Sequence, residues 1–215
     1  MKSRKRLIQI NIVILLLAVT FFHCGIFDSD EAAKYNFVEY ANFEPGNKWY
    51  YSDGHSIQVT DETKIIDGVT TRKVILQDSD NLIQNEYIEI QSNTVRYYGT
   101  DEFVYEPPMS LGSGSIKVGE SLSQTIALIS STSRDTNRME IIQTLISDND
   151  KINTPAGIFE NCLNLRNIIK VSDYSINDTS YAWYAKNIGN VKNSFAHVSI
   201  IIALDSALVN GKRLP

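Results

Sequence analysis

Short β-type runs joined by tight turns constrain the fold of this chain more than any other feature. Asp53-Gly54, Asp67-Gly68 and Asn210-Gly211 each stand between two such runs. These pairs favour the positive φ angles that a two-residue hairpin turn requires. Polar breaks such as Ser92-Asn93 separate further runs. The pattern predicts about ten short strands in close succession.

Helical periodicity is scarce, and the best helix candidate is the short stretch 30–43. Consecutive strands that are linked by hairpin turns, without helices between them, favour an antiparallel meander. The 11 tyrosines suit such strands. The sequence therefore predicts a mostly β fold with little helix, as a single antiparallel curved sheet or a partly open β-barrel.

The start of the chain has the plan of a secretory signal. Four basic residues in the stretch 1–6 precede an apolar run over 7–22, and Cys24 follows. This order resembles a bacterial lipoprotein signal, although His23 stands where that family prefers a small residue. The resemblance implies that Cys24 carries acyl chains such as palmitate and becomes the first mature residue. An uncleaved membrane anchor and an ordinary cleaved signal remain alternatives.

Three segments follow from this interpretation. Residues 1–23 are expected to be the signal peptide, 24–42 a tether, and 43–215 a single β domain. Several acyl chains on one cysteine would hold the protein firmly to a membrane. The expected location is the bacterial cell envelope, outside the cytoplasm (in the periplasm, for example), with the inner and outer membranes both open.

Charge and cysteine content narrow the functional classes. Removal of residues 1–23 leaves 16 basic and 25 acidic residues, a net charge of −9. Such an acidic surface would repel phosphates, so nucleic acid is not an expected partner. If Cys24 is acylated, Cys162 has no partner for a disulfide. Its apolar neighbours indicate a small buried hydrophobe rather than a reactive thiol.

Catalytic and metal-binding patterns are weak. His55 lies beside a turn and is expected to be exposed, and His197 is expected to begin a strand. No metal-ligand spacing, phosphate-binding loop or nucleophile motif occurs in the sequence. Glu102 and Glu106 could in principle act as acid and base, but sequence alone does not bring them together. The chain is therefore not expected to be an enzyme, and no cofactor or metal is predicted.

Three stretches resemble a family of uncharacterised bacterial secreted proteins and lipoproteins. They are "FEPGNKWYY" (43–51), "INTPAGIFENCLNLRN" (152–167) and "AWYAKNIGNVKNSF" (182–195). The resemblance implies an extracytoplasmic curved antiparallel sheet and no established reaction. The chain departs from the family pattern at Ile158, Asn187 and Asn190.

Eight residues of these stretches are the candidate structural or pocket positions. Glycine suits positions that need unusual backbone angles, proline ends a strand, and aromatic side chains plug a core or line its mouth. The candidates are Gly46, Trp49, Pro155, Gly157, Phe159, Trp183, Tyr184 and Gly189. Gly189 is expected at a turn or bulge.

The sequence supports two functions almost equally well. A curved sheet can enclose an apolar cavity, so the first is a binding module for a lipid or small apolar ligand. The second is a structural or interaction lipoprotein with a filled interior and an exposed patch for an envelope protein. A hydrolase is a distant third and would need a polar cleft.

Overall fold

The computed structural model describes residues 35–114, 116–133, 135–171 and 176–215. These residues form one short helix and thirteen strands. The elements are α2 (Phe37–Ala41), β1 (Lys48–Tyr51), β2 (Ser56–Ile66), β3 (Val69–Gln77), β4 (Ile83–Gln91), β5 (Thr94–Thr100), β6 (Phe103–Ser113), β7 (Ser121–Ser130), β8 (Thr136–Thr154), β9 (Gly157–Val171), β10 (Ile176–Ala185), β11 (Gly189–Phe195), β12 (Ile200–Val209) and β13 (Lys212–Leu214).

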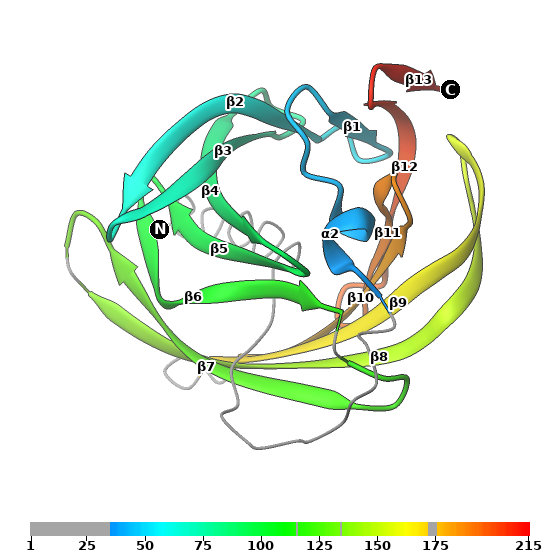
Figure 1. Ribbon diagram of the computed structural model, residues 1–215. Coiled ribbons are helices and arrows are strands. Elements are labelled where there is room, and N and C mark those ends of the chain that lie inside the picture. Colours follow the sequence, from blue (N-terminus) through cyan, green and yellow to red (C-terminus); the bar gives the residue numbers. More distant parts are fainter. Residues whose placement is uncertain (1–34, 115, 134, 172–175) are drawn as a thin grey trace.

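The strands make an antiparallel meander that closes on itself. Each strand pairs with the next along the chain, and β1 also pairs with β12, where Trp49 lies opposite Ala207. Twelve strands thus form a closed barrel, and β13 extends β12 beyond it (Figure 1). The predicted mostly β fold is confirmed. The sheet is fully closed, because β1 and β12, the first and last strands of the barrel, pair with each other.

The tight turns have the backbone geometry that their sequences favour. Asp67 and Gly68 between β2 and β3 have φ of 51° and 80°. Asn210 and Gly211 between β12 and β13 have φ of 51° and 74°. Positive φ at both central residues matches the twist of the flanking strands, so these pairs fix the register of their hairpins. These two predicted turns are confirmed, whereas the connection at Asp53-Gly54 is longer, spans residues 52–55, and has positive φ at Gly54 but not at Asp53.

Helix α2 lies within the ring of strands (Figure 1). The Asn36 side chain accepts a hydrogen bond from the Val38 N–H at its start, and Asn42 adopts a left-handed conformation at its end. Phe37 is buried and packs on Gly112, where a Cβ atom would lie 2.4 Å from the Phe37 ring. In the part of the chain that the structure describes, no helix combines the length and hydrophobicity needed to span a bilayer.

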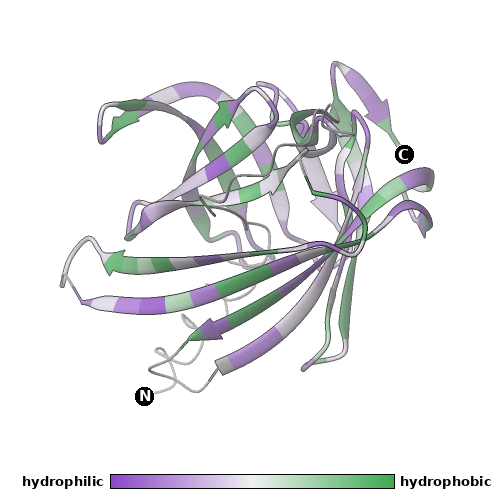
Figure 2. Ribbon diagram, turned by 60° about the horizontal axis from the view of Figure 1, so that its bottom comes forward, coloured by the Kyte–Doolittle hydropathy of each residue, from purple (hydrophilic) through white to green (hydrophobic). Residues whose placement is uncertain are grey.

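The hairpin of β8 and β9 is the longest in the barrel and bends strongly. Its tip reaches β12, where the Ala156 N–H donates to the Leu204 carbonyl at 3.2 Å (Figure 1). Along the strands, hydrophobic and hydrophilic residues alternate (Figure 2). This period of two places one set of side chains in the core and the other in solvent.

His55 and His197 both differ from expectation. His55 is buried rather than exposed, because its ring stacks on Tyr51 at 4.4 Å and its Nδ1 lies 2.5 Å from Asp53 Oδ1. His197 does not begin a strand, since it lies in the turn before β12. Its Nδ1 lies 2.6 Å from the buried Asp178 carboxylate, which holds it in that turn.

Candidate functional site

An interior cavity of about 30 Å³ lies between the segment after α2, strands β1–β6 and strand β11. It has room for about two water molecules. Most of its lining is apolar or aromatic. The lining residues are Ala41, Phe43, Trp49, Tyr51, Ile57, Val74, Glu86, Ile88, Tyr97, Leu111 and Asn190.

The Trp49 side chain forms one wall of this cavity. Its Nε1 donates to the Ile188 carbonyl at 2.6 Å, so the indole N–H is satisfied within the barrel. Gly189 has φ of 114°, and a Cβ there would lie 2.9–3.0 Å from the indole. Glycine is required at this position, directly after the β10–β11 turn, for two reasons, its backbone angle and the close approach of Trp49.

Asn190 and Tyr51 form a polar wall that is satisfied from within the protein. The Asn190 Oδ1 accepts from Asn193 Nδ2 at 2.8 Å, and Asn190 Nδ2 donates to Asn193 Oδ1 at 3.2 Å. The Tyr51 hydroxyl donates to the Asn190 carbonyl at 3.0 Å. These groups therefore shape the cavity without leaving donors or acceptors for a ligand.

Glu86 supplies the one carboxyl among the lining residues. It shares the inward face of β4 with Ile88, and it is 8% exposed. Gln84 Nε2 donates to its Oε1 at a long 3.4 Å. Burial raises the pKa of Glu86 to about 7, although the neighbouring Tyr97 hydroxyl offsets part of this rise. No ion pair to Glu86 occurs within the described residues.

Tyr97 stands beside Glu86 and is 1% exposed. Its ring centroid lies 5.1 Å from that of Tyr105. Burial, followed by the charges of Glu86 and Tyr105, raises the pKa of Tyr97 well above its usual range. The hydroxyl is close enough to Glu86 for this electrostatic effect, yet no described atom completes a hydrogen bond of ordinary geometry with it.

Arg72 is a cation on the strand beside Glu86. It lies opposite Ile88, two residues along β3 from Val74, the partner of Glu86. Its Nη1 donates to the Phe43 carbonyl at 2.5 Å. The guanidinium thus anchors the segment after α2 rather than neutralising the carboxyl.

The structure brings only part of the predicted residue set to the cavity. Trp49 lines it and Gly189 packs behind Trp49. Tyr184 is buried nearby and meets Phe37 edge to face at 5.3 Å. Gly46 lies in the turn before β1, where its N–H donates to the Val59 carbonyl at 2.9 Å.

The remaining predicted residues lie elsewhere or outside the described chain. Pro155 is exposed and Gly157 half-buried at the tip of the β8–β9 hairpin, and Phe159 is half-buried just beyond it. Trp183 is half-buried on β10, where its Nε1 donates to Asp150 Oδ2 at 2.8 Å. Cys24 lies outside the described residues.

Sequence reasoning missed Glu86, Tyr97 and Asn190 as cavity residues. A signal for Glu86 existed in "EYIEI" (86–90), where it occupies the same alternate positions as Ile88 and Ile90. A carboxyl on an apolar strand face is a candidate for a buried functional group. The partnership with Tyr97 depends on the register between β4 and β5, which a bulge between Tyr87 and Ile88 shifts.

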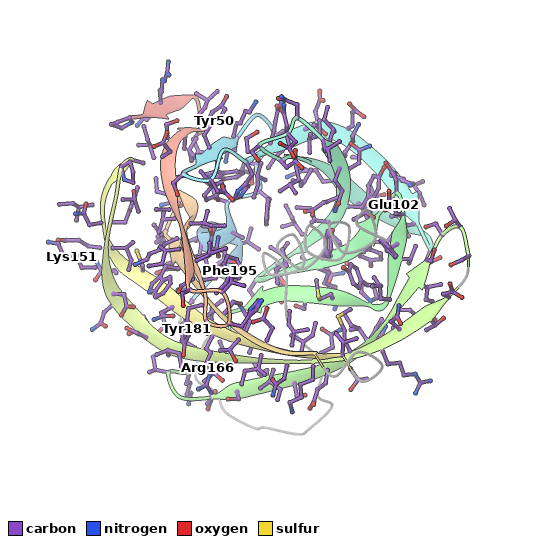
Figure 3. The ribbon with its side chains drawn as sticks, turned by 180° about the vertical axis from the view of Figure 1, so that it is seen from behind. Tyr50, Glu102, Lys151, Arg166, Tyr181 and Phe195 are labelled. Atoms are coloured by element: carbon purple, nitrogen blue, oxygen red, sulfur yellow. The ribbon has the colours of Figure 1, made fainter. Side chains whose placement is uncertain are left out.

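Other chemistry-bearing groups form no second site. The Cys162 thiol is buried, and this burial raises its pKa to about 11, so it is not a reactive thiolate at neutral pH. Across the described ranges, no three His, Cys, Asp or Glu residues gather closely enough to hold a metal ion. On the outer wall, Tyr181 lies opposite Arg166 on the neighbouring strand (Figure 3).

These features define a closed antiparallel β-barrel domain with a small interior cavity. The model of the DUF3108-like family matches residues 44–195, which is most of the chain. The protein therefore belongs to the DUF3108-like family. The expected membership of an uncharacterised bacterial family is confirmed at this level. That the three stretches 43–51, 152–167 and 182–195 are motifs of this family stays a prediction. No curated protein sequence matches this chain.

The chain matches two solved structures. One is a candidate exported protein with a YmcC-like fold from Bacteroides fragilis, with 13% identity and a TM-score of 0.51 over 76% of this chain and 96% of that chain. The other is a candidate lipoprotein from Parabacteroides distasonis, with 15% identity and a TM-score of 0.47 over 78% of this chain and 98% of that chain. At this identity the first similarity shows the fold alone.

Proposed function

We propose that this protein is an extracytoplasmic lipoprotein, tethered through Cys24, whose barrel binds a small molecule or a small end group in its interior cavity. The lipoprotein-like start of the chain supports the tether. The neighbour described as a candidate exported protein has a similar fold, which agrees with this location.

The observation that carries the binding proposal is the buried Glu86 carboxyl, which has no ion pair within the described residues, in an aromatic-lined cavity. A few convergent polar groups on an apolar lining are typical of ligand sites. The volume of about 30 Å³ suits only a few heavy atoms, so this cavity does not accommodate an acyl chain. A small polar ligand therefore fits better than the lipid that the sequence left open.

A second function, as an interaction lipoprotein, is favoured by exposed apolar residues at the start of β12. Ile200 and Ile201 are 47% and 60% exposed, and Val198 in the preceding turn is 43% exposed. Contiguous apolar exposure of this kind is typical of contact surfaces. An interaction role would predict that a partner shields these residues and that the cavity stays empty.

Membrane fractionation of the Cys24→Ser variant tests the tether. We expect the variant to leave the membrane fraction and to lose labelling by radioactive palmitate, because the acceptor sulfur is absent. The control is Cys162→Ser, which removes the buried thiol and leaves Cys24 in place. Retention of Cys24→Ser in the membrane would indicate an uncleaved anchor instead.

Native mass spectrometry of the protein purified from its own envelope tests the binding. We expect a bound mass of small size that is lost in Val74→Leu, which fills cavity space. Val118→Leu adds the same methylene at an exposed position and should keep the bound mass. Absence of any bound mass, together with capture of one protein partner that Ile201→Glu abolishes, would favour the interaction role.

A further inference from the structure

We infer that the end group bound in this cavity is a protonated primary amine, held by the Glu86 carboxylate beside the Tyr97 hydroxyl. This inference rests on the proposed function and names its ligand class.

The protein itself uses the other polar atoms of the aromatic and amide lining. Trp49 Nε1 and the Tyr51 hydroxyl donate to backbone carbonyls, and the Asn190 amide is paired with Asn193. What remains is the Glu86 carboxyl, which has a long bond from Gln84 and the Tyr97 hydroxyl beside it but no cation in contact among the described residues. An ionised carboxyl only accepts hydrogen bonds, so a ligand must bring donors.

The charge of the missing partner follows from burial. A carboxylate that is buried without a cation carries a large desolvation cost, and an opposite charge in contact recovers it. Arg72 does not fill this role, since its guanidinium is bound to the Phe43 carbonyl. The aromatic lining from Phe43, Trp49 and Tyr97 also favours a cation over an anion.

The size of the cavity selects among cations. A volume of about 30 Å³ admits an ammonium group with one or two carbons. A quaternary ammonium, with four carbons around the nitrogen, is too large and has no N–H to donate. The site therefore suits a primary amine, either free or at the end of a larger molecule such as an ethanolamine lipid.

Binding should depend on pH through Glu86. Because its pKa is about 7, the ionised fraction rises about tenfold from pH 6 to pH 8. The other ionisable groups that line the cavity or interact with Glu86 are Tyr51, Tyr97 and Tyr105. Burial raises the pKa of all three tyrosines above its usual range, so none of them titrates between pH 6 and pH 8. Affinity for an ammonium ion should rise about tenfold over this interval.

The test is calorimetric titration of ethylammonium chloride into the purified full-length protein in maltoside micelles at pH 8. Ethanol is the neutral probe of equal heavy-atom number, and tetramethylammonium is the oversized cation. We expect ethylammonium to bind at least tenfold more tightly than either. Mixed micelles that contain phosphatidylethanolamine distinguish two sources of the amine. If the lipid competes with ethylammonium, the amine is that of a lipid headgroup, and if it does not compete, the amine is a free one.

Glu86→Gln should weaken ethylammonium binding at least tenfold and leave ethanol binding unchanged. Glu102→Gln is the matched control, because Glu102 is an exposed residue at the β5–β6 turn (Figure 3). Should Glu86→Gln fail to fold, the pH series on the unaltered protein remains decisive, and equal affinity at pH 6 and pH 8 would overturn the inference.

The outcomes separate the two proposals. Ethanol binding as tight as ethylammonium, unaffected by Glu86→Gln, would overturn the amine and keep a cavity that binds small molecules. No binding of any probe, together with no bound mass in the purified protein, would overturn both.

Discussion

The two sides of the barrel interior treat buried polar groups in opposite ways. On the side of β8–β11, buried amides pair with one another, as in the Asn190–Asn193 pair and in the bond from Gln143 Nε2 to Asn167 Oδ1 at 2.9 Å. On the side of β4 and β5, the Glu86 carboxyl has the Tyr97 hydroxyl beside it and a long 3.4 Å bond from Gln84, but no ion pair within the described residues. The first side pairs its buried amides with one another, whereas the second holds a buried carboxyl without an opposite charge.

The largest loss of stability is expected at Gly189. Gly189→Ala combines a positive φ of 114° with a Cβ that meets the Trp49 indole at 2.9–3.0 Å. Backbone strain and displacement of Trp49 should together lower the free energy of unfolding by about 3–4 kcal/mol. Urea denaturation followed by tryptophan fluorescence measures this. A loss below about 1 kcal/mol would mean that Trp49 does not define the wall.

Glu86→Gln should raise the free energy of unfolding at pH 8 rather than lower it. The folded-state pKa of about 7 exceeds the ordinary 4.5, so the folded protein binds more protons between these values and loses stability as the pH rises through them. Above pH 7 the full penalty applies, about 3 kcal/mol at most. The variant should therefore be more stable than the unaltered protein at pH 8 and nearly equal at pH 4. Thermal unfolding across this pH range without amines measures the difference, and a constant gap would contradict the assignment.

Asn193→Ala tests the side of β8–β11, where buried amides pair with one another. It leaves the Asn190 side-chain oxygen without its 2.8 Å donor inside the barrel, so we expect a loss of about 2 kcal/mol. The change in unfolding midpoint should be independent of pH between 5 and 8, in contrast to Glu86→Gln. A stabilised variant would remove the distinction between the two sides.

The smallest effect is expected at Gly157→Ala. This glycine also has a positive φ, 134°, but a Cβ there meets nothing within 4 Å. Only backbone strain opposes the substitution, at a cost of about 1 kcal/mol. Comparison with Gly189→Ala under the same denaturation conditions isolates the contribution of the Trp49 contact. Equal losses at both glycines would mean that this contact contributes nothing.

Local sequence signals predicted the elements of the fold well. Asp67-Gly68 and Asn210-Gly211 specify their turns because few other pairs adopt positive φ at both positions. Closure of the barrel was not predictable in the same way. The pairing of Trp49 with Ala207 joins residues that are distant in the sequence, and no local pattern encodes it.

The cavity was harder to predict than the strands. Trp49 was identified because a large aromatic side chain must be buried somewhere, but the same argument applied equally to Trp183, whose N–H instead bonds to Asp150 on β8. Alternation identifies the face of β4 that carries Glu86. The lack of an ion pair to its carboxyl emerges only when all the surrounding strands are in place.

The ladder between β1 and β12 has a consequence for how the polypeptide acquires its structure. Strand β1 can pair only after β12, which ends at Val209, has been made. Synthesis or translocation must therefore be almost complete before both open edges are covered. Contacts of such high sequence separation slow folding. Any chain that is cut short before β12 would keep two unprotected edges, and it should aggregate or be degraded rather than survive as a smaller barrel.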